Sequence, residues 1–90
     1  MNPYKEVIES DVIVRTFSED VESEELVWHR DKNDRVVEVI QSNGWKFQMD
    51  NELPKTLKSG NVVEIPKETF HRVIKGFEDL VVSWRADNDC

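Results

Sequence analysis

Cysteine is nearly absent from this 90-residue sequence, and long apolar runs are missing altogether. The one cysteine, Cys90, has no partner for an intramolecular disulfide, which differs from the disulfide frameworks of small secreted domains and fits a reducing compartment. No stretch approaches the ~18 apolar residues of a membrane-spanning helix, and residues 1–10 lack the apolar centre of a signal peptide. We therefore expect a cytoplasmic protein with no membrane partner.

Positive charge is also scarce. Lys and Arg together number 12, against 19 Asp and Glu, and the formal net charge is −7. A protein that neutralises phosphates needs clustered cations, so we do not expect nucleic acid as a partner, and the acidic surface is interpreted as serving solubility. Hydrophobic residues make up 38% of the chain, which suffices for one small core, and we expect a single domain spanning residues 1–90.

Helical periodicity is missing as well. In its place, short runs rich in β-branched residues recur, and the segments between them supply the Gly, Asn, Asp and Pro that tight turns need. This pattern predicts an all-β sandwich or barrel, and the acidic residues 18–25 are expected to form a solvated loop. The expected strands, about eight in number, span residues 4–8, 11–17, 25–29, 35–41, 45–49, 61–66, 70–74 and 79–84.

Alternation within the runs predicts which side chains share a face. In residues 35–41, Arg35 falls on the same side as the two inward-pointing residues Val37 and Val39. If the alternation of the run 25–29 continues for two residues beyond its end, His29 and Asp31 share one side of the chain. The strand pattern therefore brings a histidine, a carboxylate and an arginine together without any appeal to a known family.

The stretch GNVVEIPKETFH resembles the second conserved motif of the cupin superfamily. That motif has a Gly, usually followed by an Asp, then a Pro after four residues and a His five residues beyond the Pro. Gly60, Pro66 and His71 match it, whereas Asn61 stands in place of the Asp and Glu68 in place of a Gly that usually follows the Pro by two residues.

The stretch HRDKNDRVVEVIQSNG is similar to the first cupin motif, in which His-x-His is followed by a Glu and a Gly. The first His falls on His29, the second on Asp31, the Glu on Arg35 and the closing Gly close to Gly44. The Gly that opens this motif is missing. Fifteen residues lie between Gly44 and Gly60, a short gap of the kind that small bacterial-type cupins have.

The resemblance covers roughly residues 11–85 and implies a fold. It implies a small single-domain, RmlC-like jelly-roll β-barrel of antiparallel strands, with a site inside the barrel mouth. Cupins often dimerise, so a homodimer is expected. Short phage-encoded cupins are expected among the nearest relatives.

The first functional hypothesis is a metal site. In metal-binding cupins three His and one Glu hold a divalent ion, and this chain offers His29, Asp31 and His71. Two histidines with one carboxylate form a known ligand set of non-haem iron enzymes. The hypothesis is a small-molecule-binding domain with a divalent transition metal, Fe, Mn, Zn or Ni, on these three residues.

The second hypothesis is a metal-free module. A guanidinium cannot ligate a metal, so an inward Arg35 would repel an ion and pair with Asp31 instead. Such a pocket could bind a small anion, a carboxylate or a phosphorylated metabolite. An outward Arg35 would favour the ion, and a shift of register by one residue would place Asp34 at the site. The expected ligand-binding residues are Arg35, Trp45, Phe47 and Trp84.

The third hypothesis is a dimeric structural or interaction protein without catalysis. Leu26 and Trp28 are expected opposite His29, where they would form an exposed apolar patch suited to a partner. No reaction follows from any of these patterns, because the fold that they resemble supports many chemistries.

Overall fold

Strands make up most of residues 3–86, which are the residues that the computed structural model describes. Cys90 lies outside them. The strands of the described residues are β1 (Tyr4–Glu9), β2 (Val12–Phe17), β3 (Arg35–Asn43), β4 (Lys46–Met49), β5 (Lys55–Thr56), β6 (Val62–Ile65), β7 (His71–Ile74) and β8 (Phe77–Arg85). One short 3₁₀ turn, η1 (Ser23–Glu25), interrupts the long connection between β2 and β3.

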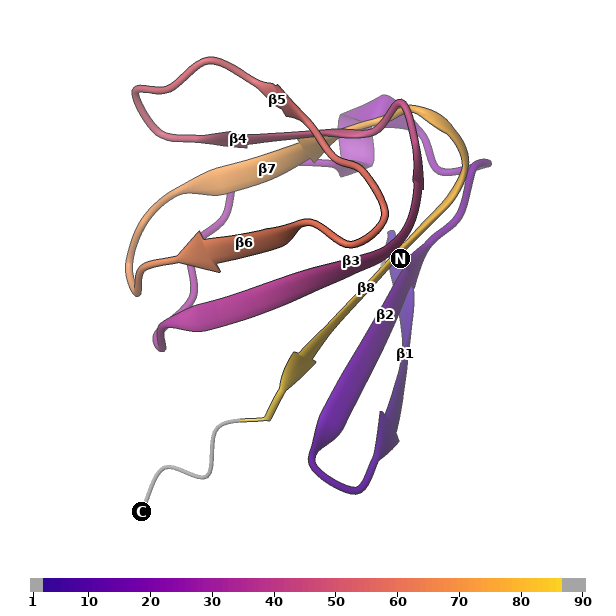
Figure 1. Ribbon diagram of the computed structural model, residues 1–90. Coiled ribbons are helices and arrows are strands. Elements are labelled where there is room, and N and C mark those ends of the chain that lie inside the picture. Colours follow the sequence, from indigo (N-terminus) through magenta and orange to yellow (C-terminus); the bar gives the residue numbers. More distant parts are fainter. Residues whose placement is uncertain (1–2, 87–90) are drawn as a thin grey trace.

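The strands form two antiparallel sheets. The five-stranded sheet has the order β1-β2-β8-β3-β6, and the three-stranded sheet has the order β5-β4-β7. Figure 1 shows the three-stranded sheet above the part of the larger sheet that contains β3 and β6, with the β1–β2 hairpin extending away at the other side. The prediction of an all-β protein with about eight short antiparallel strands is therefore confirmed.

One expected strand is absent, one observed strand was not expected, and the ends of the others differ from the expected ones by at most two residues. Residues 25–29 do not form a strand, because only His29 pairs, in an isolated bridge with His71. The strand β5 was not expected, because it follows directly on a segment with a strong turn composition. The count of eight strands is reached with β5 in place of residues 25–29.

The acidic segment 18–25 is also more than a solvated loop. Val21 and Leu26 flank η1, and both are buried in the core. The amide of Leu26 donates to the carbonyl of Ser23 at 3.1 Å, which closes the turn while most of the acidic side chains stay exposed. The predicted exposure of Leu26 is therefore wrong, and of the expected patch Trp28 alone is exposed.

The core lies between the two sheets, as alternation predicted. Val37 and Val39 of β3 are buried, whereas Val36 and Ile40 point outward and are exposed. Burial of such apolar side chains is the main stabilising contribution in a domain of this size. The buried apolar residues are Phe17, Val21, Leu26, Val37, Val39, Trp45, Phe47, Leu57, Ile65, Leu80, Val82 and Trp84.

A close crossing of two turns fixes one end of the structure. A methyl group added at Gly76 would lie 2.3 Å from the backbone nitrogen of Trp45, so only glycine fits there. The neighbouring β4–β7 ladder starts here at the Lys46–Ile74 pair and ends at the Met49–His71 pair. The glycine crossing therefore anchors one end of β7, and His71 lies at the other.

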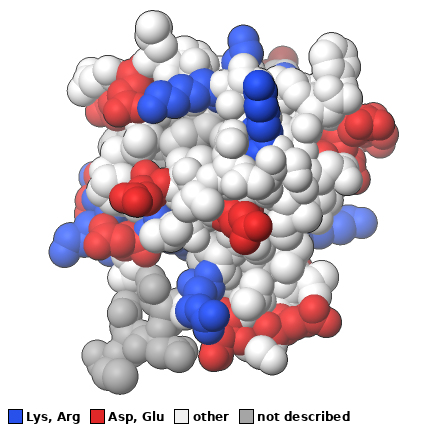
Figure 2. All heavy atoms as spheres, viewed as in Figure 1, with Lys and Arg blue, Asp and Glu red and all other residues white. Residues whose placement is uncertain are grey.

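Acidic and basic side chains are interspersed on the face of the molecule that Figure 2 shows. Among residues 3–86 no helix has the length and apolar character needed to cross a bilayer.

Candidate functional site

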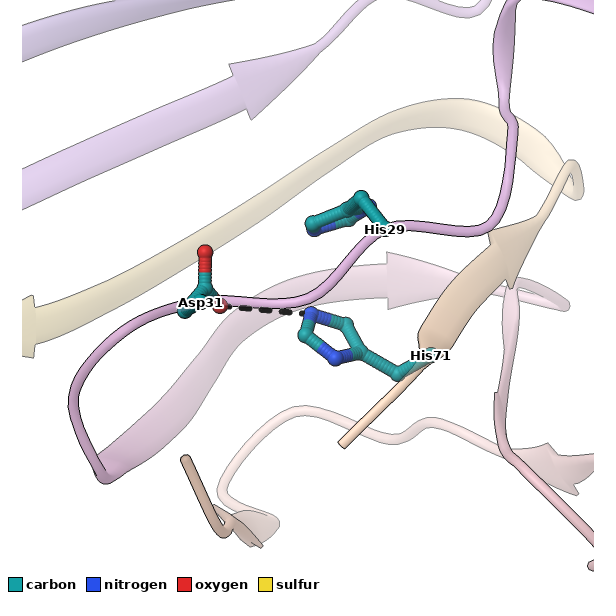
Figure 3. Close-up of side chains that lie close together, drawn as sticks. All are labelled: His29, Asp31 and His71. Carbon is teal, nitrogen blue, oxygen red and sulfur yellow. Dashed lines mark ion pairs between the residues drawn. The ribbon is translucent and has the colours of Figure 1, made fainter. Parts of the chain in front are cut away.

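Two segments that are distant in the sequence meet at β7, an edge strand of the three-stranded sheet. The amide of His29 donates to the carbonyl of His71 at 3.0 Å, and the amide of His71 donates back at 2.8 Å. Figure 3 shows His29 and Asp31 on one loop segment, with His71 facing them from β7. One ligand atom from each of these three side chains lies within 4.8 Å of the other two.

The turn before β7 holds the Asp31 segment in place. The amide of Glu68 donates to the carbonyl of Asp31 at 2.7 Å, and the amide of Lys67 donates to a carboxylate oxygen of Asp34 at 2.7 Å. An exposed ion pair between Arg30 and Glu68 (3.3 Å) adds to this connection. Because Asp34 is exposed and caps the neighbouring turn, the alternative that placed it at the site is wrong.

The His71 ring is buried, and burial favours its neutral form. Its Nδ1 lies 2.9 Å from the carbonyl oxygen of Thr69, which assigns the ring proton to Nδ1. Burial is the largest effect on its pKa and lowers it below the usual value, and the nearby His29 and Arg35 lower it further. The Thr69 hydrogen bond and the Asp31 carboxylate act in the opposite direction without outweighing burial.

This tautomer brings two acceptors face to face. With its proton on Nδ1, His71 directs the lone pair of Nε2 towards Oδ2 of Asp31, 3.4 Å away. That carboxylate oxygen is fully buried and receives no hydrogen bond from the described residues. A buried acceptor without a donor is costly, and a cation between the two atoms would satisfy both. The three residues therefore fit a divalent metal.

Arg35 is the competing cation. Its Nη1 lies 3.3 Å from Oδ2 of Asp31, an ion pair without the geometry of a hydrogen bond, and the guanidinium lies over the Trp84 ring at 4.6 Å. Arg35 thus points inward, beside Asp31. This is the orientation that the sequence analysis linked to a metal-free module.

A cavity of about 60 Å³, partly open to solvent, lies between the sheets. Phe47 and Trp84 line it with Arg35, but Trp45 does not, because its indole is fully buried and donates to the carbonyl of Glu78 at 2.9 Å. Apart from two arginines and two histidines, the lining is apolar. A wider groove of about 280 Å³ borders the same site from outside and contacts His29 and Asp31.

Arg15 borders both the cavity and the groove, and the sequence analysis missed it. Its guanidinium pairs with Glu6 and lies between the rings of Tyr4 (3.8 Å) and Trp84 (4.7 Å). Alternation would have found it, since Arg15 shares the inner face of β2 with the core residue Phe17.

Several solved structures are similar to that of this chain. The structure is similar to that of KdgF from Halomonas sp., with a TM-score of 0.66 and 16% identity over 96% of this chain and 80% of that one. It is also similar to a cupin-2 domain containing protein from Shewanella frigidimarina, with a TM-score of 0.62 and 21% identity over 90% of this chain and 76% of that one. An RmlC-like cupin from the same organism has a TM-score of 0.63 and 15% identity over 87% of this chain and 67% of that one. The chain has the cupin fold. No protein-family model and no curated protein sequence matches it.

The cupin fold explains why the two sequence motifs meet. The first runs from the His29 loop into β3, and the second runs through β6 into β7, which the fold places beside that loop. At identities of 15 to 21% the likeness to other cupins concerns the fold and not a reaction. The expected phage relatives and the expected homodimer stay predictions.

Proposed function

We propose that this chain is a small-molecule-binding domain that holds a divalent transition metal on His29, Asp31 and His71. The observation that supports the proposal is the contact between Nε2 of His71 and the buried Oδ2 of Asp31, two acceptors 3.4 Å apart. Two histidines and a carboxylate would leave positions open for a ligand on Fe, Mn, Zn or Ni. When bound, such an ion supplies Lewis acidity to a coordinated ligand.

The surroundings of the histidines support the same assignment. Histidines that ligate metals usually donate their second ring N–H to a carbonyl or carboxylate, which fixes the ring. His71 makes this contact with Thr69 at 2.9 Å, and Nδ1 of His29 lies 3.4 Å from the carbonyl oxygen of Val27. In both rings Nε2 is then the atom available to an ion.

A metal-free anion site is the second candidate, and the orientation of Arg35 favours it. Arg35 already pairs with a carboxylate, that of Asp31, in a partly buried position. A carboxylate or phosphorylated ligand could take the place of Asp31 at the same guanidinium. In this alternative the histidines are neutral pocket residues, and no ion is bound.

A thermal-shift series separates the two candidates. Chelator-treated, tag-free protein is melted alone and with Zn²⁺, Mn²⁺, Ni²⁺ or, without oxygen, Fe²⁺. A metal at a hundred times its dissociation constant stabilises a protein by ~2.7 kcal/mol, which corresponds to a rise of roughly 10–20 °C for a domain of this size.

The variants decide which residues are responsible. His29→Ala, Asp31→Ala and His71→Ala should each abolish the rise, whereas Glu38→Ala, which removes an exposed carboxylate from the outer face of β3, should keep it. A rise that survives all three substitutions would place the ion elsewhere and contradict the proposal. If no metal changes the melting temperature, the anion site is the better description.

We also propose a homodimer. The observation behind it is the outer face of the five-stranded sheet, where Val36 and Val62 are 60% and 61% exposed on adjacent strands. A second copy of the chain would cover these side chains in a two-fold arrangement.

A further inference from the structure

The geometry points to a ligand class: Arg35 anchors a short aliphatic monocarboxylate, and a metal on Asp31 releases Arg35 to do so. This inference rests on the metal site proposed above. It states that binding of the metal at Asp31 and binding of the carboxylate at Arg35 strengthen each other, because the two residues form an ion pair in the metal-free protein.

One carboxylate oxygen of Asp31 contacts Arg35 and also faces the proposed metal position, so the two cations compete for its charge. The same atom, Oδ2, faces Nη1 of Arg35 at 3.3 Å and Nε2 of His71 at 3.4 Å. When this oxygen ligates a metal together with His71, its charge is shared with the ion, and the attraction that it offers to Arg35 falls. Arg35 then lacks a full counter-charge in a partly buried position, which favours binding of an anion.

The second arginine at the cavity does not change in this way. Arg15 has a carboxylate of its own, because its Nε donates to Glu6 at 2.7 Å and a further guanidinium nitrogen contacts the same oxygen. Glu6 is not among the converging residues of the metal site. Arg35 is therefore the arginine whose partner depends on metal binding.

Trp84 keeps Arg35 at the cavity. The guanidinium lies 4.6 Å from the centre of the buried Trp84 ring, a cation–π contact that does not involve Asp31. Arg35 is also held in β3 by its pairing with Ile65 of β6. The planar guanidinium therefore stays at the cavity lining, where it can take a ligand carboxylate through two parallel hydrogen bonds.

The cavity determines what is attached to the carboxylate. Away from the two arginines and the two histidines its lining is apolar, with aliphatic side chains from both sheets, among them Val63, Val73 and Val82. A dry apolar cavity of ~150 Å³ accepts benzene, and this one has about 60 Å³. A tail of two or three carbon atoms fits this volume, so the class is a short aliphatic acid with a single charge.

Calorimetry with Zn²⁺ and butyrate tests the coupling. The first titration adds Zn²⁺ to the chelator-treated protein. The second adds butyrate to the zinc-loaded protein and to the metal-free protein. We expect butyrate to bind the zinc-loaded protein at least tenfold more tightly, within the range usual for coupled sites. By reciprocity, butyrate should raise the affinity for Zn²⁺ by the same factor.

Three controls show where butyrate binds. Arg35→Gln should remove the gain in butyrate affinity while Zn²⁺ still binds, and should tighten Zn²⁺ binding because a competing cation is gone. Butanol, which has the same chain length without the charge, should not bind detectably. Val63→Phe, which fills the cavity, should weaken butyrate binding and leave Zn²⁺ binding unchanged.

The outcomes distinguish this inference from the proposed function. If neither Zn²⁺ nor any other metal of the thermal-shift series binds, both fail. If Zn²⁺ binds and the affinity for butyrate is equal with and without it, the metal site stands and the coupling is overturned. If zinc-loaded Arg35→Gln binds butyrate as tightly as the unmodified protein, the carboxylate sits on the metal, and the role of Arg35 is overturned.

Discussion

At the scale of single residues, Glu68 holds a backbone conformation that favours glycine. Its φ is 59°, in the left-handed region, at the position where the similar cupin motif usually has a glycine. The amide of Glu68 donates to the carbonyl of Asp31, so this turn helps to position the proposed metal ligand. The chain thus keeps the turn geometry of the motif with a residue that is strained there.

Glu68→Gly should therefore raise the free energy of unfolding by about 1 kcal/mol, because it removes the cost of the side chain in the left-handed region. Glu68→Ala is the matched control, since it also loses the ion pair with Arg30 but keeps the strained Cβ. Urea unfolding of both variants measures the difference. Equal stability of the Gly and Ala variants would show that the backbone is not strained at this position.

His71 gives the metal-free protein a pH dependence. Burial lowers its pKa below the ordinary 6.5, so as the pH falls the unfolded chain takes up a proton before the folded chain does. The free energy of unfolding should then fall as the pH is lowered from about 7.5 to about 5.5. His71→Gln should flatten this slope in chelator-treated protein, measured by urea unfolding at several pH values. An unchanged slope would mean that His71 titrates alike in both states.

At the scale of elements, the connection between β2 and β3 both covers the core and supplies the site. Val21 and Leu26 on either side of η1 are buried, and three residues after Leu26 the same segment bridges to β7 through His29. Packing of Leu26 therefore fixes the path by which His29 and Asp31 approach His71.

Leu26→Ala should lower the free energy of unfolding by about 2–4 kcal/mol, because it leaves a cavity at a buried position. Val27→Ala is the neighbouring control, at a residue that is 62% exposed, and should cost less than about 0.5 kcal/mol. Thermal or urea unfolding of both variants checks the contrast. A similar loss in both would mean that Leu26 is not part of the core.

The same segment marks the limit of what the sequence predicted. Alternation placed the inward residues of β3 correctly, because this strand presents one face to the core. It failed for residues 25–29, where a buried Leu26 follows a 3₁₀ turn and alternation has no meaning. The meeting of His29, Asp31 and His71 followed from the motifs, and the inward side of Arg35 followed from its alternation with Val37 and Val39. The contact of Arg35 with Trp84 depended on tertiary packing and was not predicted.

At the scale of the whole molecule, the two faces of the larger sheet differ, and the outer one mixes exposed aliphatic side chains with charged ones such as Glu38 and Glu64. The inner face packs on the core, whereas the outer face carries aliphatic side chains on most of its strands. A sheet face of this kind is suited to a second copy of the chain. The exposed members are Val7, Val12, Val36, Ile40 and Val62.

Replacing Val36 and Val62 together by Lys should therefore convert a dimer into a monomer, because like charges would face each other across the two-fold axis. Size-exclusion chromatography with light scattering measures the mass. Leu53→Lys is the control, at a residue that is 84% exposed and lies outside the strands. A wild-type chain that elutes with the mass of one copy would refute the dimer, and a dimer that persists in the double variant would place its interface elsewhere.

The bridge between His29 and His71 has a kinetic consequence. It is an isolated bridge of two backbone hydrogen bonds, whereas His71 itself also belongs to the ladder between β4 and β7. The segment with His29 and Asp31 can separate from β7 when these two hydrogen bonds and its contacts with the turn at Lys67 and Glu68 break, while both sheets stay intact. Such local opening requires much less free energy than global unfolding. An ion held as proposed on His29, Asp31 and His71 would then leave at the rate at which this short segment opens, without global unfolding of the protein.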